Sequence, residues 1–171
     1  LVRTFGTDDG LPSAALEDFA RDERDTLWIA SAAGLACLTL PPSVSRIGIP
    51  GRTERFDVSS LVLHEGTLHA AAAGYLLRLE TAAGAASFLV RLVKLERSPT
   101  SLHSAGSRLL LGDFSGLSAF DGHGVAPLLD RDAPSALSLL RLRDRPDSLI
   151  AAEAYAISTY TLTGAGWQRT E

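Results

Sequence analysis

The sequence predicts an all-β fold built from four similar units, and three series of matched residues lead to this prediction. An apolar run recurs at intervals of 41, 41 and 40 residues, starting at Leu27, Leu68, Leu109 and Leu149. A second apolar run follows each at a nearly fixed distance and opens at Gly34-Leu35, Gly74-Tyr75, Gly116-Leu117 and Ala156-Ile157. A third run precedes each of them, over residues 15–20, 61–64, 102–104 and 136–142. Three series of apolar runs, each occurring four times at nearly constant spacing, indicate an internal repeat.

Each unit is expected to contain several short β-strands. The runs have about four to eight residues and often alternate apolar with polar or small residues, and Gly, Asp, Ser and Pro separate them. Glycine follows a polar or small residue where a turn needs positive φ, at Asp9-Gly10, Glu65-Gly66, Ala105-Gly106 and Asp121-Gly122. All eight prolines are expected between the core runs, where no ladder hydrogen bond is lost. A repeat of this length with about four strands is typical of a β-propeller blade, and a β-sandwich with coincidental spacing is the alternative fold.

The repeats predict four blades, over residues 6–57, 58–98, 99–133 and 134–171. The segment Val2–Phe5 is expected to be a strand of a preceding blade, and Trp167–Arg169 the outer strand of the fourth. Both faces of a blade pack on neighbouring blades. This explains why Leu27-Trp28-Ile29 is apolar at each position, although alternate residues of a strand point to opposite faces. Small residues such as Ala30 and Ala151 suit the crowded region near the propeller axis.

Composition restricts the class of protein. The 171 residues (18.1 kDa) are 46% apolar and 21% charged, which argues against disorder, and the net charge of −4 argues against a general nucleic-acid-binding surface. The single cysteine, Cys37, excludes an intrachain disulfide and a multi-cysteine metal cluster. Apolar stretches are interrupted well before about 18 residues, so no membrane insertion is expected. The absence of a leader and of methionine leads us to expect a processed or excised segment.

The first repeat carries a specific motif. It reads Asp9-Gly10-Leu11-Pro12-Ser13, then Leu27-Trp28-Ile29-Ala30-Ser31, then Gly34-Leu35. This resembles the two-component regulator propeller repeat, whose pattern is Asp-Gly-Leu-Pro-Ser, an Asp-Gly turn, Leu-Trp-Ile-Gly-Thr and a closing Gly-Leu. The sequence departs at Arg24-Asp25, where the family has Asp-Gly, and at Ala30-Ser31, where it has Gly-Thr. The match is specific over residues 9–39. The later repeats share the spacing of its apolar runs but not its individual residues.

The resemblance implies a non-catalytic, ligand-sensing propeller of a bacterial receptor, in the periplasm or another extracytoplasmic compartment. In that family the repeats form the input part of membrane-anchored histidine kinases, hybrid regulators or diguanylate cyclases, commonly with seven blades in a ring. A homodimer of the full receptor is therefore expected, and the four blades are expected to be part of a larger ring. An opened ring exposes two faces, and about 400 Å² of apolar surface on each corresponds to about 10 kcal/mol. The segment should therefore need the remaining blades, a second copy of itself or a tight four-blade closure.

Two loops carry the candidate ligand site. In a propeller, the connections between blades and those between second and third strands emerge on one face, where ligands usually bind. The segments Asp113-Phe114-Ser115 and Glu153-Ala154-Tyr155 each set a carboxylate near an aromatic ring, which suits an oligosaccharide or another small molecule. Asp9 and Ser31 belong to the same expected face and complete the candidate set. The competing interpretation is that Asp113 and Ser115 form a turn and that the ring packs on the next blade.

The sequence predicts no catalytic residue, no metal site and no cofactor. The run Asp8-Asp9-Gly10 lacks the spaced ligands of a calcium loop, and His64 and His69 have no evident third ligand. No Gly-x-Ser-x-Gly motif is present, and Cys37 is expected to be an inert core thiol. A propeller lyase, lactonase or glycosidase is the alternative function. The third interpretation is a protein-interaction platform that assembles with another chain.

Overall fold

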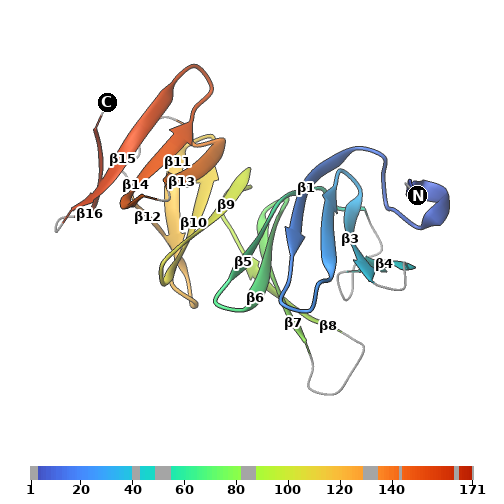
Figure 1. Cartoon of the computed structure of the whole chain (residues 1–171). Coiled ribbons are helices and arrows are strands. Elements are labelled where there is room, and N and C mark those ends of the chain that lie inside the picture. The colour runs from blue at the N-terminus through green and yellow to red at the C-terminus, as the bar shows by residue number, and fades with distance from the viewer. Residues whose placement is uncertain are drawn as a thin grey trace. The chain divides into compact units, whose positions relative to one another are not determined.

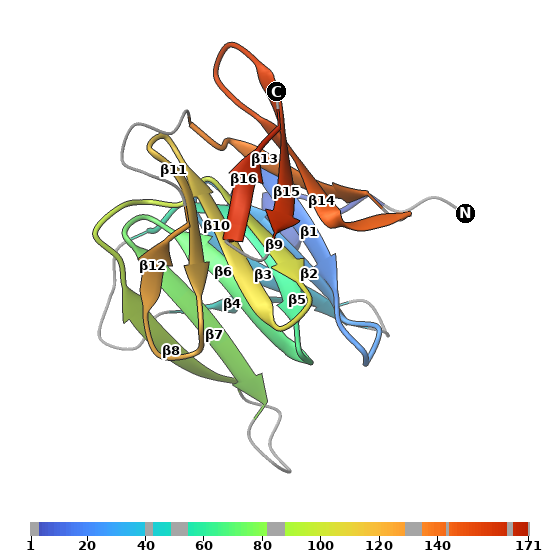
Figure 2. The same ribbon diagram turned by 90° about the vertical axis from the view of Figure 1, so that its left-hand side faces the viewer.

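The computed structural model describes residues 4–39, 43–48, 55–81, 88–128, 135–142, 144–163 and 166–170. These residues form sixteen β-strands and one short 3₁₀ turn, Thr7–Asp9. The strands make four antiparallel sheets of four, in which each strand pairs with the next along the chain (Figure 1; Figure 2). The prediction of four four-stranded units is therefore confirmed. In the residues so described, no helix is long and apolar enough to cross a membrane.

Each sheet corresponds to one repeat of the sequence, and we number the sheets in chain order. Sheet 1 contains β1 (Leu16–Arg21), β2 (Leu27–Ser31), β3 (Gly34–Thr39) and β4 (Ser43–Ile47). Sheet 2 contains β5 (Val58–His64), β6 (Thr67–Ala72), β7 (Tyr75–Thr81) and β8 (Phe88–Lys94). Sheet 3 contains β9 (Ser101–Ala105), β10 (Arg108–Asp113), β11 (Gly116–Phe120) and β12 (Val125–Pro127). Sheet 4 contains β13 (Ser138–Leu142), β14 (Arg145–Ala152), β15 (Ile157–Thr163) and β16 (Gly166–Arg169).

The chain divides into two compact units, and sheets 1 and 2 lie in the first, Leu1–Glu96. Trp28 and Leu35 on one face of sheet 1 form a buried cluster with Leu68 and Leu77 of sheet 2. A carboxylate also joins these sheets, because Oδ2 of Asp18 on β1 accepts hydrogen bonds from residues of β5. Its donors are the backbone N–H of Leu61 at 2.7 Å and the hydroxyl of Ser60 at 3.1 Å. Apolar burial and this polar clamp together hold the two sheets face to face.

Sheets 3 and 4 lie in the second unit, Arg97–Glu171. Leu110 and Leu117 of sheet 3 pack with Leu149, Tyr160 and Trp167 of sheet 4 in a second buried cluster. The backbone of β10 closely approaches the segment that precedes β13, because a Cβ on Gly112 would lie 2.2 Å from the carbonyl oxygen of Ala136. Glycine is therefore required at this point of contact between the two sheets.

The turn glycines behave as the sequence predicts. Gly10, Gly66, Gly106 and Gly122 all have positive φ, at 111°, 72°, 63° and 96°. Asp25 also has positive φ, at 62°, and it stands where the resembled repeat has glycine. The β1–β2 turn therefore has the backbone conformation of the family pattern in spite of the substitution.

Two expectations about local structure are only partly met in the described residues. Pro127 and Pro146 lie within strands: Pro127 ends the edge strand β12, and Pro146 is the second residue of β14, near a register shift. Edge positions and irregularities tolerate proline because no regular ladder hydrogen bond is required there. The described part of the segment Val2–Phe5 belongs to no strand, and residues 1–3 lie outside the described residues. Phe5 instead packs beside a buried cluster that contains Leu11 and Ile29.

Candidate functional site

The β10–β11 connection presents a phenylalanine ring to solvent. Asp113 and Ser115 form a tight turn, in which the backbone N–H of Ser115 donates to Oδ1 of Asp113 at 2.5 Å. The carbonyl oxygen of Asp113 also accepts a hydrogen bond from the backbone N–H of Ala136 at 2.8 Å, which ties the loop to sheet 4. Phe114, between the two turn residues, has 72% of its surface exposed. The predicted turn is present, but the ring faces solvent and does not pack on the neighbouring sheet.

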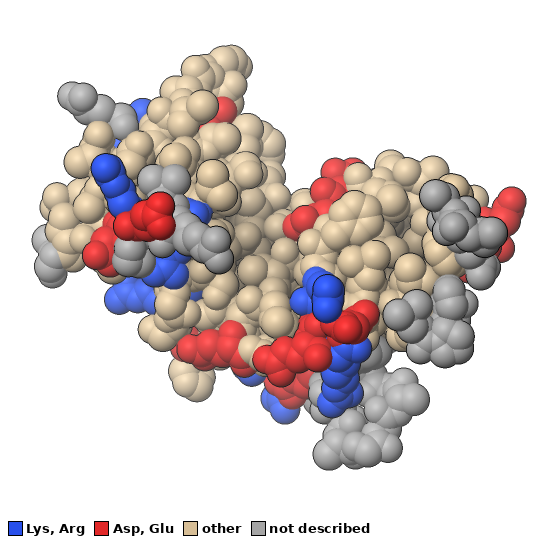
Figure 3. Space-filling view, in the orientation of Figure 1, with Lys and Arg blue, Asp and Glu red and all other residues tan. Residues whose placement is uncertain are grey.

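The β14–β15 connection presents a tyrosine in the same way. The backbone N–H of Glu153 donates to the carbonyl oxygen of Ala156 at 2.8 Å, which closes the turn. Ala154 is fixed by a hydrogen bond from its backbone N–H to the hydroxyl of Ser135 at 3.1 Å. Tyr155 is fully exposed. Figure 3 shows that the surface around the β14–β15 connection, at the top of the view, consists mainly of residues other than Lys, Arg, Asp and Glu.

A polar network around Glu153 holds the base of the same connection. The carboxylate of Glu153 is only 4% exposed and accepts a hydrogen bond from the hydroxyl of Tyr160 at 3.1 Å. Arg169 is 3.4 Å from the same carboxylate and donates to the hydroxyl of Ser158 at 2.6 Å. Burial, together with the hydrogen bond to Glu153 and its charge, raises the pKa of Tyr160 to about 12. Glu153 is thus a positioning residue that anchors the loop, and its carboxylate is not free for a ligand.

The other two candidates belong to the first unit, and their polar groups are used by turns. Ser31 is completely buried, and its hydroxyl donates to the carbonyl oxygen of Gly34 at 2.8 Å. Asp9 is exposed, and its Oδ2 accepts a hydrogen bond from the backbone N–H of Gly6 at 2.9 Å. In the first two repeats the β2–β3 and β6–β7 turns carry no exposed aromatic ring, since they consist of Ala32-Ala33 and Ala73-Gly74. Among these candidates, the exposed aromatic surface therefore lies on sheets 3 and 4.

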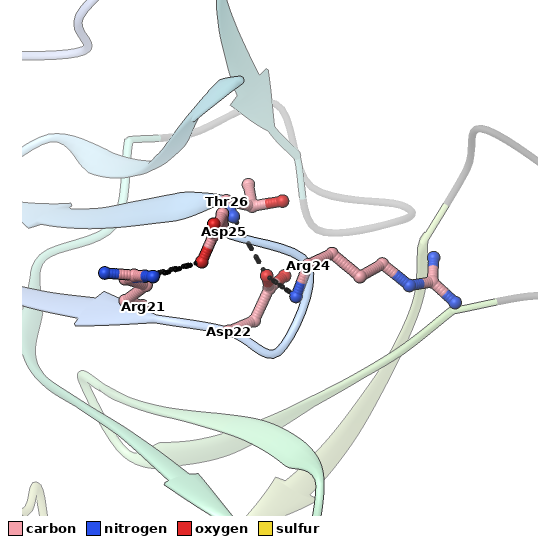
Figure 4. Close-up of polar contacts among 5 residues, drawn as sticks. All are labelled: Arg21, Asp22, Arg24, Asp25 and Thr26. Atoms are coloured by element: carbon pink, nitrogen blue, oxygen red, sulfur yellow. Dashed lines mark hydrogen bonds and ion pairs between the residues drawn. The ribbon is translucent and has the colours of Figure 1, made fainter. Parts of the chain in front are cut away.

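A carboxylate that the sequence analysis did not single out organises the β1–β2 hairpin. Oδ2 of Asp22 accepts a hydrogen bond from the indole N–H of Trp28 at 3.0 Å. Its Oδ1 accepts hydrogen bonds from the backbone N–H groups of Arg24 and Thr26 at 2.9 and 3.0 Å (Figure 4). Burial alone would raise the pKa of Asp22, but these hydrogen bonds, together with one from the Thr26 side chain, outweigh it and leave the pKa below its ordinary value. The predicted burial of Trp28 is confirmed, at 1% exposure.

The histidine pair and the cysteine are core groups. His64 and His69 lie edge to face with ring centroids 5.9 Å apart, and both are buried. Burial is the main reason that the pKa of His69 is lowered to about 4. Burial likewise raises the pKa of the Cys37 thiol, which makes it a poor nucleophile. Within the described ranges, no group of three or more His, Cys, Asp or Glu side chains is placed to hold a metal ion.

Comparison with known proteins adds information on the fold. No family model and no curated protein matches the sequence. Among solved structures, the chain is similar to the extracellular domain of BT4673 from B. thetaiotaomicron, described as a hybrid two-component system, with a TM-score of 0.74 and 17% identity. The extracellular domain of BT3049 from the same organism, also described as a hybrid two-component system, gives a TM-score of 0.70 at 12% identity. The chain has a β-propeller fold.

These neighbours are consistent with the resemblance to the two-component regulator propeller repeat. The match covers 91% of this chain and 22% of the BT4673 domain, and 99% of this chain and 26% of the BT3049 domain. A catalytically inactive virginiamycin B lyase from Staphylococcus aureus, solved with quinupristin, is equally similar in fold. It has a TM-score of 0.74 and 11% identity, and the match covers 94% of this chain and 57% of the lyase. The chain therefore spans only part of each of these three proteins.

Proposed function

We propose that this chain is the ligand-sensing propeller segment of a bacterial, membrane-anchored signalling receptor and lies in the periplasm or another extracytoplasmic compartment. The neighbours that are extracellular domains of two-component systems support this role. The observation that carries the ligand site is the exposure of Phe114 and Tyr155, which stand in the equivalent loops of sheets 3 and 4. An exposed aromatic ring offers a flat apolar face on which a ligand can stack, and such rings are common in binding sites.

The chemistry of the two loops favours an uncharged, ring-shaped ligand such as an oligosaccharide unit. Each aromatic face can stack on the apolar face of a sugar ring, and neighbouring backbone groups can bind its hydroxyls. Glu153 contributes indirectly, because its contacts with Tyr160 and Arg169 hold the loop in place. Asp113 likewise holds the β10–β11 loop in place, because its carboxylate accepts a hydrogen bond from the backbone N–H of Ser115. In this proposal Asp9 and Ser31 take no direct part, since their polar atoms are used by turns.

Ligand binding would act on the output part of the receptor through the geometry of its dimer. A ligand shifts an equilibrium between two arrangements only if it binds one of them better than the other. Stacking against rigid loops of the propeller would favour one packing of the propeller against the membrane-proximal part. The change would then reach a kinase or cyclase domain across the membrane.

The test measures binding with a panel of oligosaccharides and small metabolites. Phe114→Ala and Tyr155→Ala should each weaken binding of the best ligand by about tenfold, since loss of one stacked ring removes about 1–2 kcal/mol. Phe19→Ala is the matched control, because Phe19 is another exposed aromatic residue, 52% exposed, on β1. If both loop variants bound that ligand as tightly as the parent protein, the proposal that Phe114 and Tyr155 form the binding site would be contradicted.

The second candidate function is a propeller lyase, and the similarity to virginiamycin B lyase favours it. The direct test is incubation of the chain with quinupristin in the presence and absence of a divalent metal. Mass spectrometry would then show whether the compound is cleaved. Metal-dependent cleavage that a chelator abolishes would establish the enzyme and displace the sensor proposal.

A further inference from the structure

The last strand of sheet 2, β8, forms a long edge with which no other described strand pairs (Figure 2). It pairs with β7 over seven consecutive residue pairs without a register shift. The outer strands of the other sheets are shorter, with five residues in β4, three in β12 and four in β16. Proteins usually protect a sheet edge by shortness, proline, a bulge or charge, because an open edge can pair with another chain. The edge of β12 is short and ends in proline, whereas five of the seven residues of β8 are apolar.

The backbone of β8 directs hydrogen-bonding groups away from the sheet. The N–H of Leu95, directly after β8, donates to the carbonyl oxygen of Gly74 at 2.9 Å and so points toward β7. Along an antiparallel strand, consecutive residues direct their backbone N–H and C=O groups to opposite edges. Val93 therefore bonds to β7, like Leu95, whereas Val90 and Leu92 direct these groups to the open edge. The edge thus offers evenly spaced donors and acceptors to a further strand.

The residues with outward backbone groups carry apolar side chains on the side of sheet 2 that packs against sheet 1. Leu92 pairs with Leu77 and Val90 with Leu79, and directly paired residues share one side of a sheet. Leu77 and Leu79 are buried in the cluster with sheet 1, and Val90 packs at its margin. Leu92 is 39% exposed. An apolar side chain on an added strand would therefore cover Leu92 and extend this cluster.

The other side of the same edge is positively charged. Arg91 pairs directly with Arg78, and both guanidinium groups share the carboxylate of Glu80, at 3.1 Å from Arg91 and 3.5 Å from Arg78. The Nε of Arg78 is buried and has no hydrogen-bond partner among the described residues. A second carboxylate beside Arg91, whose side chain is 62% exposed, would leave Glu80 to Arg78 and balance both positive charges.

A second copy of β8 does not supply that carboxylate, because the strand carries two cations, Arg91 and Lys94, and no acidic residue. Like charges on directly paired residues are destabilising. We propose that the open edge of β8 binds an extended segment of a partner protein by strand addition. The segment is apolar on the side beside Val90 and Leu92 and acidic on the side beside Arg91. This surface belongs to the first unit and uses no residue of the proposed ligand site.

Hydrogen exchange with a designed peptide tests this proposal on the full chain. The probe is a short peptide that alternates valine with glutamate, and its control alternates valine with lysine. We expect a saturating amount of the acidic peptide to slow exchange at the N–H groups of Val90 and Leu92 by about tenfold or more, because they gain acceptors. Exchange at Arg91 and Val93 should change much less, since their N–H groups already bond to β7. The lysine peptide should bind about tenfold more weakly at low salt.

Two pairs of variants separate strand addition from charge attraction. Leu92→Pro removes an outward N–H and spares the bonds to β7, so it should weaken binding of the acidic peptide by about tenfold or more. Leu92→Thr keeps that N–H and should keep most of the binding. Arg91→Gln should lower the preference for the acidic over the lysine peptide by about threefold. Lys94→Gln removes the same charge on the opposite side of the strand and should lower the preference less.

Three results would overturn the proposal. In the first, the acidic peptide protects neither Val90 nor Leu92, or protects Arg91 and Val93 equally. In the second, Val90 and Leu92 become protected when the chain alone is concentrated, because a second copy would then occupy the edge. In the third, the two peptides bind equally well, which would exclude an acidic partner.

Discussion

The indole N–H of Trp28 donates a hydrogen bond to Oδ2 of Asp22, with the two atoms 3.0 Å apart. The ring is 1% exposed and lies in the cluster between sheets 1 and 2, so this bond joins the core to the β1–β2 turn. The other carboxylate oxygen holds the backbone of the same turn through Arg24 and Thr26. One side chain therefore satisfies three donors where a hairpin meets the hydrophobic core.

Asp22→Asn should destabilise the protein by about 1–3 kcal/mol, because an amide replaces one acceptor by a donor and leaves a hydrogen-bond donor unsatisfied. The folded pKa of Asp22 is depressed, so its contribution is present above the ordinary value of 3.8 and is lost as the pH falls through the folded pKa. Urea denaturation at pH 7 and pH 3 measures both effects. The neighbouring exposed Glu23→Gln is the control, and an equal loss in both variants would contradict the assignment.

Asp25 tests the conformation of the same turn. Its φ of 62° is left-handed, and its carboxylate forms an exposed ion pair with Arg21. Asp25→Gly should raise stability by about 0.5 kcal/mol, since relief of the backbone outweighs an exposed ion pair of about 0.2–1 kcal/mol. Asp25→Ala loses the pair without that relief and should cost about 1 kcal/mol or more. Urea midpoints should rank Gly above Asp above Ala, and an alanine variant as stable as the glycine variant would refute the argument.

The sequence predicts the architecture well because the same pattern occurs four times, so a strand that is uncertain in one repeat can be identified from the others. Each of the anchor runs at Leu27, Leu68, Leu109 and Leu149 begins or lies within a second strand of its sheet. A strand buried on both faces leaves a signal that depends only on hydrophobicity and spacing. The turns at Gly10 and Gly106 are predicted for a similar reason, since positive φ strongly favours glycine.

The candidate site is less predictable, because a sequence gives residue types but not the direction in which a carboxylate points. Asp113 and Glu153 look alike as acidic residues beside aromatic ones. In the structure, however, one accepts a hydrogen bond within its own turn and the other is buried and accepts a hydrogen bond from Tyr160. The roles of Asp18 and Asp22 depend on partners that spacing alone does not reveal, such as Leu61 on another sheet. The periodic pattern determines which residues are buried, and three-dimensional contact determines how the polar ones are used.

Gly112 tests the contact between sheets 3 and 4. An added Cβ would lie 2.2 Å from the carbonyl oxygen of Ala136 and 2.5 Å from the hydroxyl oxygen of Ser101, and the Ala136 backbone is itself held by a hydrogen bond to Asp113. Gly112→Ala should therefore cost about 1–3 kcal/mol or more through overpacking. Gly124→Ala is the control, because nothing lies within 4 Å of its added Cβ. A wild-type Tm for Gly112→Ala would show that the sheets are not in close contact there.

Tyr160 connects the candidate site to stability at alkaline pH. Its hydroxyl donates to the buried carboxylate of Glu153, and its folded pKa is raised from 10.0 to about 12. The folded state therefore keeps the proton when the unfolded chain has lost it. Stability from this group is fully present below pH 10 and is lost as the pH rises through about 12. Tyr160→Phe should flatten the decline in stability between pH 10 and pH 12, and urea denaturation over that range measures it.

The same substitution separates the structural role of Glu153 from a role in ligand contact. Tyr160→Phe removes the tyrosine hydroxyl that donates to this carboxylate but leaves Arg169 in place, so the β14–β15 loop should loosen while Tyr155 stays exposed. Hydrogen exchange at the N–H of Glu153, which closes the turn, should then accelerate. Tyr155→Phe is the matched variant, since it removes an exposed hydroxyl and should leave both the alkaline stability and this exchange rate unchanged. If the two tyrosine variants behaved alike, the buried network would not be what holds the loop.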